Sequence, residues 1–254
     1  MKVFFFFLLL SCHAHPISKL DEKPINYIQA STDFVMSLKN HQDVEIYIKI
    51  FEKANFEQLQ MQLGEDSQKL TFWINIYNGY IIYILRKNPE LYENRRDFFK
   101  NKQIEIAGES WSFSDIEHGI IRGSQHEYFL GYMKKWFPKK RERQMRVKNR
   151  DYRIHFALNC GAKSCPPVVV YQIDRLDQQL NQSTERYLTK NTTYDMESKI
   201  VKTTTLFSWF RGDFGGKKGI KKKLLSLNLI PDKDVKLAYM TYDWTLDLTQ
   251  FVDN

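Results

Sequence analysis

The chain has 254 residues, of which 43% are apolar and 15% aromatic, and its formal net charge is +8. This length permits one large domain or two small ones, and the apolar share excludes a chain that is disordered throughout. The positive charge suits an anionic membrane, an anionic polymer or a nucleic acid, but it also serves solubility alone.

The first residues have the pattern of a secretory signal peptide over residues 1–14. Lys2 precedes a short apolar run that is too short to span a bilayer, and Ala14 is a suitable cleavage residue. The stretch that ends at Cys12 also resembles a lipobox, which would make Cys12 a lipidated first residue. We expect an exported protein of the periplasm, cell envelope or extracellular space, either free or attached to a membrane through Cys12.

Residues 15–30 are polar and irregular and are predicted to form a tether. A single domain is predicted over residues 31–254, beginning with a helix capped by Ser31–Asp33. More helix is expected over residues 44–63, with a break near Ala54–Asn55.

The central helix of the domain is predicted over Asp66–Asn88, where Pro89 ends it. This stretch is apolar nearly all round, so the helix should be buried on most sides. Asn75 and Asn78 share one face of it, and each buried amide without a partner costs about 1–3 kcal/mol. Either they bond the backbone of a neighbouring loop, or one of them orients a catalytic group or a substrate.

Alternation over Gln103–Gly108 predicts a short strand. Ser114–Glu117 then fits a capping box, which predicts a helix from Asp115 to Arg122. Glu117 and Arg122 on this helix are candidate binding residues. His118 lies beside isoleucines, where a histidine is either structural or an acid–base group.

A basic segment runs from Lys134 to Arg153, with ten lysines and arginines against two acidic residues. Aromatic residues occur only at its ends, whereas nucleic-acid binders usually interleave them with the positive charges. We therefore read no specific nucleic-acid signal, and residues 134–150 form either a solvated surface or a contact for an anionic one. Arg153 is a further candidate binding residue.

The densest group of reactive side chains lies between Arg153 and Pro167. The alternating segment 154–158 predicts a strand that carries His155, and Cys160 and Cys165 follow it. In an exported protein these two cysteines can pair, and closing so short a loop would stabilise the fold by about 2 kcal/mol.

The last third mixes helices and strands. Strand-like residues occur at 168–171, 199–207 and 237–246, and helical periodicity at 174–188 and 217–227. We expect an α+β fold, a helix-rich single domain around the buried central helix. Its small, mostly antiparallel sheet should include 154–158, 199–207 and 237–242.

Five motifs resemble the family called domain of unknown function 547. They are Phe72–Asn78, Ser114–Arg122, Ile154–Pro167, Trp209 with Asp213–Phe214, and Tyr242–Leu246. The resemblance implies a domain over about residues 40–250. The family occurs in exported bacterial proteins and in eukaryotic ones, where it can be joined to glutaredoxin-like modules, and it has no agreed activity.

Two kinds of function fit these residues, so whether the chain is an enzyme stays open. Strand parity would put His155 and Cys160 on opposite faces, so a catalytic thiol would use His118, oriented by Asn75 or Asn78. That set indicates a papain-like or transglutaminase-like hydrolase or transferase. The favoured alternative is a binding or structural module in which a Cys160–Cys165 bridge pins a turn.

Two other kinds of chemistry receive less support from the spacing. Cys-x₄-Cys is not the redox motif Cys-x-x-Cys, so thioredoxin mechanics do not carry over. The histidines and thiols match no common zinc pattern, and the sequence predicts neither a metal site nor a cofactor.

Overall fold

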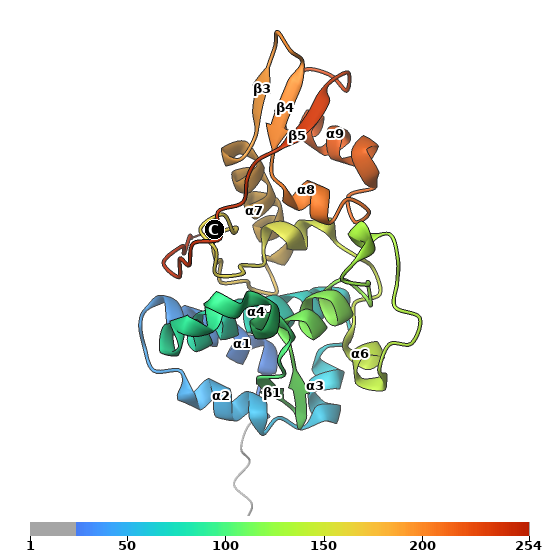
Figure 1. The fold of residues 1–254 in the computed structure, drawn as a ribbon. Coiled ribbons are helices and arrows are strands. Elements are labelled where there is room, and N and C mark those ends of the chain that lie inside the picture. Colours follow the sequence, from blue (N-terminus) through green and yellow to red (C-terminus); the bar gives the residue numbers. More distant parts are fainter. Residues whose placement is uncertain (1–23, 254) are drawn as a thin grey trace, which may run out of the picture.

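The computed structural model describes residues 24–253 (Figure 1). The predicted signal peptide and Cys12 lie outside this range. No helix within it has both the length and the apolar character needed to cross a membrane.

The central helix is α4 (Asp66–Lys87), as its apolar sequence predicts. A reciprocal capping box between Glu65 and Gln68 starts it, and most of its side chains are buried. α1 (Tyr27–Lys39) packs along it closely enough that a Cβ on Gly79 would lie 2.3 Å from the Phe34 ring. The small residue at position 79 is therefore what allows the two helices to touch.

The remaining elements form two groups along the chain, mainly helical before residue 160 and mixed after it. In chain order they are α2 (Glu45–Glu52), α3 (Phe56–Gln62), η1 (Pro89–Asn94), α5 (Arg95–Lys100), β1 (Ile104–Ile106), β2 (Glu109–Trp111), η2 (Asp115–Ile121), η3 (Phe129–Gly131), α6 (Lys140–Met145), η4 (Tyr152–Phe156), α7 (Leu176–Lys190), β3 (Thr193–Asp195), β4 (Ile200–Thr203), α8 (Leu206–Trp209), α9 (Gly216–Ser226) and β5 (Lys236–Tyr239).

Within residues 24–253, two small sheets complete the helix-rich α+β fold, which confirms the predicted class. β1 and β2 form an antiparallel hairpin. In the second sheet, β4 lies between β3, to which it is antiparallel, and β5, to which it is parallel.

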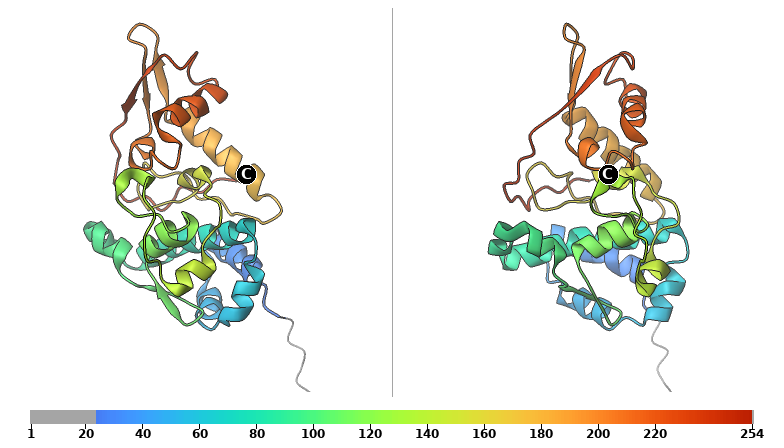
Figure 2. Two further views of the ribbon diagram at one scale, coloured as in Figure 1. Left: turned by 90° about the vertical axis from the view of Figure 1, so that its right-hand side faces the viewer. Right: turned by 45° about the vertical axis from the view of Figure 1, so that its right-hand side comes forward.

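Two hydrophobic clusters hold the molecule together. The larger surrounds α4 and contains most of the buried residues up to Leu180. The smaller includes Phe156, Phe207 and Phe214 and lies among α7, α8, α9 and the second sheet. Figures 1 and 2 show these elements as a separate group on one side of the layer that contains α4. Tyr242 packs against both clusters, so the two groups meet near this residue.

Sequence predictions about local structure are wrong in several segments. Segment 154–158 is not a strand, because Tyr152–Phe156 forms a 3₁₀ helix in which Ala157 N–H donates to Ile154 C=O at 3.0 Å. Segment 168–171 makes only an isolated bridge, between Val168 and Phe251. The first helix begins at Tyr27, inside the predicted tether, because Asn26 rather than Ser31 caps it.

Candidate functional site

The short helix η2 carries two of the candidate site residues and has an unusual geometry. It is a π-helix, with hydrogen bonds of 2.9 Å from Arg122 N–H to Glu117 C=O and 2.8 Å from Ser124 N–H to Gly119 C=O. The predicted capping box at Ser114–Glu117 is wrong. Ser112 and Asp115 instead cap each other's backbone N–H groups, at 3.0 and 3.1 Å. π-Helical turns occur frequently at functional sites.

One cavity of about 330 Å³ lies beside η2, and all five sequence motifs contribute to its wall or to the side chains directly behind it. Aromatic residues dominate the wall, and the polar groups are few. The lining residues are Tyr77, Phe99, Ser114, Glu117, His118, Glu127, His155, Leu158, Cys160, Cys165, Pro166, Leu206, Trp209, Phe210, Tyr242 and Trp244. A few polar groups in an aromatic pocket are typical of small-molecule sites.

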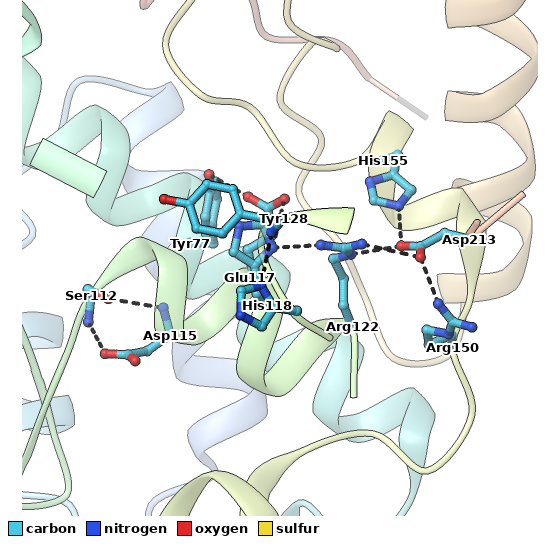
Figure 3. A network of polar contacts seen from close by, with 11 residues as sticks. Tyr77, Ser112, Asp115, Glu117, His118, Arg122, Tyr128, Arg150, His155 and Asp213 are labelled. Atoms are coloured by element: carbon cyan, nitrogen blue, oxygen red, sulfur yellow. Dashed lines mark hydrogen bonds and ion pairs between the residues drawn. The ribbon is translucent and has the colours of Figure 1, made fainter. Parts of the chain in front are cut away.

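Glu117 is a partly buried carboxyl group in this wall. Tyr77 donates a hydrogen bond to it at 3.3 Å (Figure 3). Burial raises the pKa of Glu117 to about 7, with smaller contributions from the nearby carboxylates of Asp213 and Glu127. The positive charge of Arg122 opposes this rise without cancelling it. Glu117 can therefore gain or lose a proton near neutral pH.

His118 is held in one tautomer by Arg122. The Nη1 of Arg122 lies 2.8 Å from His118 Nδ1, and a guanidinium can only donate, so Nδ1 must accept. The proton of the neutral ring is therefore on Nε2. Burial and the charge of Arg122 hold the pKa of His118 well below its usual value. The uncharged His118 ring thus carries its N–H at Nε2, and the residue lines the cavity.

Asp213 anchors this arrangement from behind the cavity, and Figure 3 shows it between three partners. It accepts from Arg122 Nε at 2.7 Å, from Arg150 Nη1 at 2.7 Å and from His155 Nε2 at 2.8 Å. Burial raises the pKa of Asp213, but the hydrogen bonds from His155 and Arg122 outweigh it and hold the pKa well below its usual range. Asp213 is therefore ionised, and Arg122 is fixed in position behind His118.

His155 is buried between Asp213 and an aromatic ring. It stacks on Phe210 with ring centroids 4.0 Å apart. Burial lowers the pKa of His155 to about 4, although the hydrogen bond to Asp213 favours the charged form. The ring is neutral at pH 7, so its Nε2–H donates to Asp213 and its Nδ1 is an acceptor.

The predicted disulfide between Cys160 and Cys165 is present and forms part of the cavity wall. The hydroxyl of Tyr242 lies 3.3 Å from the Sγ of Cys160 and 3.1 Å from that of Cys165. Cys165 is buried and its Sγ accepts from the Cys160 N–H at 2.9 Å, whereas Cys160 is only half-buried. Gly161 has a φ of +83°, which the tight turn between the cysteines requires.

The other predicted site residues lie outside the cavity wall. Asn75 bonds both backbone groups of Tyr171, at 2.9 and 3.1 Å. Asn78 donates to Ala157 C=O at 2.9 Å and accepts from Asn159 N–H at 2.8 Å. Arg153 forms ion pairs with Asp151 and Asp177.

Several residues of the site were not among the predicted candidates. Tyr77, Trp209, Asp213, Tyr242 and Trp244 surround or support the cavity. All five are in the quoted motifs, so the motifs themselves were the signal that could have found them. Within residues 24–253, no group of three or more His, Cys, Asp or Glu side chains is arranged to hold a metal ion.

A family model described as "Protein of unknown function, DUF547" matches residues 61–188. The chain belongs to the DUF547 family. No curated protein and no solved structure matches the chain. The part that matches the DUF547 model includes Glu117, His118 and the disulfide, whereas Asp213 and Tyr242 lie beyond it.

Proposed function

We propose that this DUF547 protein is an enzyme and that the cavity beside η2 is its active site. The observation that carries the proposal is the meeting of five motifs, spread from residue 72 to residue 246, around one cavity. A module in which the disulfide only pins a turn does not need such convergence, nor a carboxyl group with a pKa near 7 in an aromatic wall.

Glu117 would act as the general base, and His118 as the hydrogen-bond donor to the substrate. A base works best when its pKa lies near the working pH, as that of Glu117 does. A neutral imidazole N–H can polarise a carbonyl oxygen without bringing a full charge to the site. The reaction class that fits is proton abstraction next to a carbonyl group, or attack of water on one.

The lining also suggests the substrate class. Six aromatic side chains surround the polar groups, namely Tyr77, Phe99, Trp209, Phe210, Tyr242 and Trp244. The volume of about 330 Å³ is at the lower end of small-molecule sites. We therefore propose a small carbonyl compound with an apolar or aromatic part.

A cysteine-dependent hydrolase or transferase is the second candidate, because Cys160 is half-buried in the same wall as His118. This reaction would require prior reduction of the disulfide. His118 would also be a weak base for it, since Arg122 occupies Nδ1, and burial together with the charge of Arg122 keeps the pKa of His118 low. The side-chain amides of Asn75 and Asn78 bond backbone groups, so they are not placed to orient His118. We therefore favour Glu117 as the base.

Turnover tests the proposal with Glu117→Gln and a matched control, Glu185→Gln. Glu185 is exposed on α7 and does not belong to the cavity wall. The wild type is screened against small aryl esters, ketones and aldehydes in deuterated water, with hydrolysis and deuterium uptake read by mass spectrometry. For any substrate found, we expect Glu117→Gln to reduce kcat/KM by about 10²–10⁴-fold and Glu185→Gln to change it little.

Three outcomes would decide between the functions. Full activity in Glu117→Gln would refute the assigned base. Activity that appears only after reduction, and disappears in Cys160→Ser, would favour the cysteine-dependent enzyme. Saturable binding of the same compounds without any turnover would leave the cavity as that of a binding module.

A further inference from the structure

The segment between η3 and α6 exposes large aromatic side chains, a kind of side chain that is mostly buried in folded proteins. Trp136 is 80% exposed and Phe137 93% exposed, and the nearby Tyr132 is 61% exposed. Figure 1 shows the segment as a loop along the outer edge of the molecule, ending at α6. Neighbouring exposed rings of this size usually mark an interaction site.

The base of this loop is firmly attached to the rest of the molecule. His126 N–H donates to Met133 C=O at 2.9 Å, and Lys135 N–H donates to Ser124 C=O at 2.8 Å. Arg150 Nη1 also donates to Gly131 C=O at 3.0 Å. The exposed rings are therefore presented by a supported loop and not by a free end.

Positive charges flank the rings on both sides in the sequence. Lys134, Lys139, Lys140 and Arg143 are exposed, and among residues 24–253 no acidic side chain lies within ion-pair distance of them. Their neighbours Lys135 and Arg141, by contrast, are paired with Glu142 and Glu109. The structure thus leaves four cations beside two exposed rings.

We propose that residues 132–143 form a docking surface for an anionic phospholipid bilayer. Trp136 and Phe137 would enter the interface between headgroups and acyl chains, where aromatic rings are stable. The four unpaired cations would contact the lipid phosphates, and each basic residue near an anionic surface adds to the attraction. A single-stranded nucleic acid instead prefers rings spaced along a basic groove, whereas these two rings are adjacent in one loop.

Vesicle sedimentation tests this surface with the full chain carrying Cys12→Ala, so that no acyl chain at Cys12 contributes. Binding is compared on phosphatidylcholine vesicles and on vesicles that also contain phosphatidylglycerol. We expect preference for the anionic vesicles, and an affinity for them at least about tenfold lower in Trp136→Ala/Phe137→Ala. Lys139→Glu/Lys140→Glu should remove the preference.

Matched variants control for general apolar and charge effects. Ile46→Ala/Met196→Ala removes two exposed apolar side chains elsewhere, and Lys217→Glu/Lys218→Glu makes the same charge change on α9. Both should bind like the parent chain. Equal binding by the loop variants and their controls would overturn the proposal, as would equal binding to the two kinds of vesicle. Unchanged vesicle binding together with lost binding to a single-stranded oligonucleotide would make the loop a nucleic-acid surface instead.

Discussion

The pKa values of two carboxyl groups near the cavity are shifted in opposite directions because their surroundings differ. Glu117 receives a hydrogen bond from Tyr77, but the effect of its burial dominates, so its pKa rises to about 7. Asp213 receives hydrogen bonds from two arginines and a histidine, and they hold its pKa well below the usual range. Environment thus gives Glu117 a proton to exchange and makes Asp213 a permanent anion.

The acidities of Glu117 and His155 predict how stability depends on pH. Glu117 stabilises the fold below its unfolded pKa of 4.5, and this contribution is lost as the pH rises through about 7. His155 stabilises the fold above 6.5, and its contribution is lost as the pH falls through about 4. Between pH 4.5 and 6.5 the two effects oppose each other.

Replacing Glu117 by glutamine removes its opposing contribution, so the effect of His155 on the pH dependence of stability should become visible. We expect the free energy of unfolding of Glu117→Gln to fall by at least about 3 kcal/mol between pH 6.5 and 4, because His155 alone contributes about that much and His118 adds to it. The wild type should change less over this interval. Urea unfolding at a series of pH values measures both, with Glu185→Gln, at an exposed position of α7, as control. Parallel curves for wild type and Glu117→Gln would contradict the raised pKa of Glu117.

At the scale of elements, α4 fixes the loop that carries the cysteines. Asn78 bonds the backbone on either side of Leu158, and this support replaces the neighbouring strand that a β-conformation would need. The alternation that predicted a strand at 154–158 was misleading because all five residues are buried, including His155. A period of two indicates a strand only when one face is exposed.

Asn78→Ala tests whether this residue acts as a clamp or as a catalyst. The change leaves the C=O of Ala157 and the N–H of Asn159 without their partner inside the core, so we expect a loss of about 3 kcal/mol in the free energy of unfolding. Asn101→Ala, at an exposed asparagine after α5, should change it by less than about 0.5 kcal/mol. Unchanged stability with lost turnover in Asn78→Ala would make Asn78 a catalytic residue.

At the scale of the whole molecule, the sequence predicts elements better than it predicts the site. The apolar run of α4 and the periodicity of α7 identify these helices, because the signal lies within each segment. The cavity depends on pairs far apart in the chain, such as Arg122 and Asp213, which are 91 residues apart. His118, Cys160 and the disulfide could be proposed from residue type. A motif contains Asp213, but the contacts that this residue makes with Arg122, Arg150 and His155 required the fold.

Asp213 also connects the two hydrophobic clusters. It adjoins Phe214 of the smaller cluster and bonds Arg122, which follows η2 on the side of α4. We therefore expect the two groups of elements to unfold together in the wild type. Asp213→Asn leaves the buried Arg122 and the exposed Arg150 without their anion, so it should lower the free energy of unfolding by about 3–5 kcal/mol, mainly through Arg122. Asp213→Asn should also allow the two hydrophobic clusters to unfold at different urea concentrations.

Fluorotryptophan NMR during urea unfolding measures that coupling, because Trp73 lies on α4 and Trp209 on α8. The two resonances should change together in the wild type, whereas in Asp213→Asn Trp209 should change at lower urea. Asp177→Asn provides the control, because its ion pair with Arg153 is largely exposed on the aspartate side and should contribute less than about 1 kcal/mol. Coincident transitions in Asp213→Asn would mean that apolar packing around Tyr242 couples the clusters without the buried ion pair.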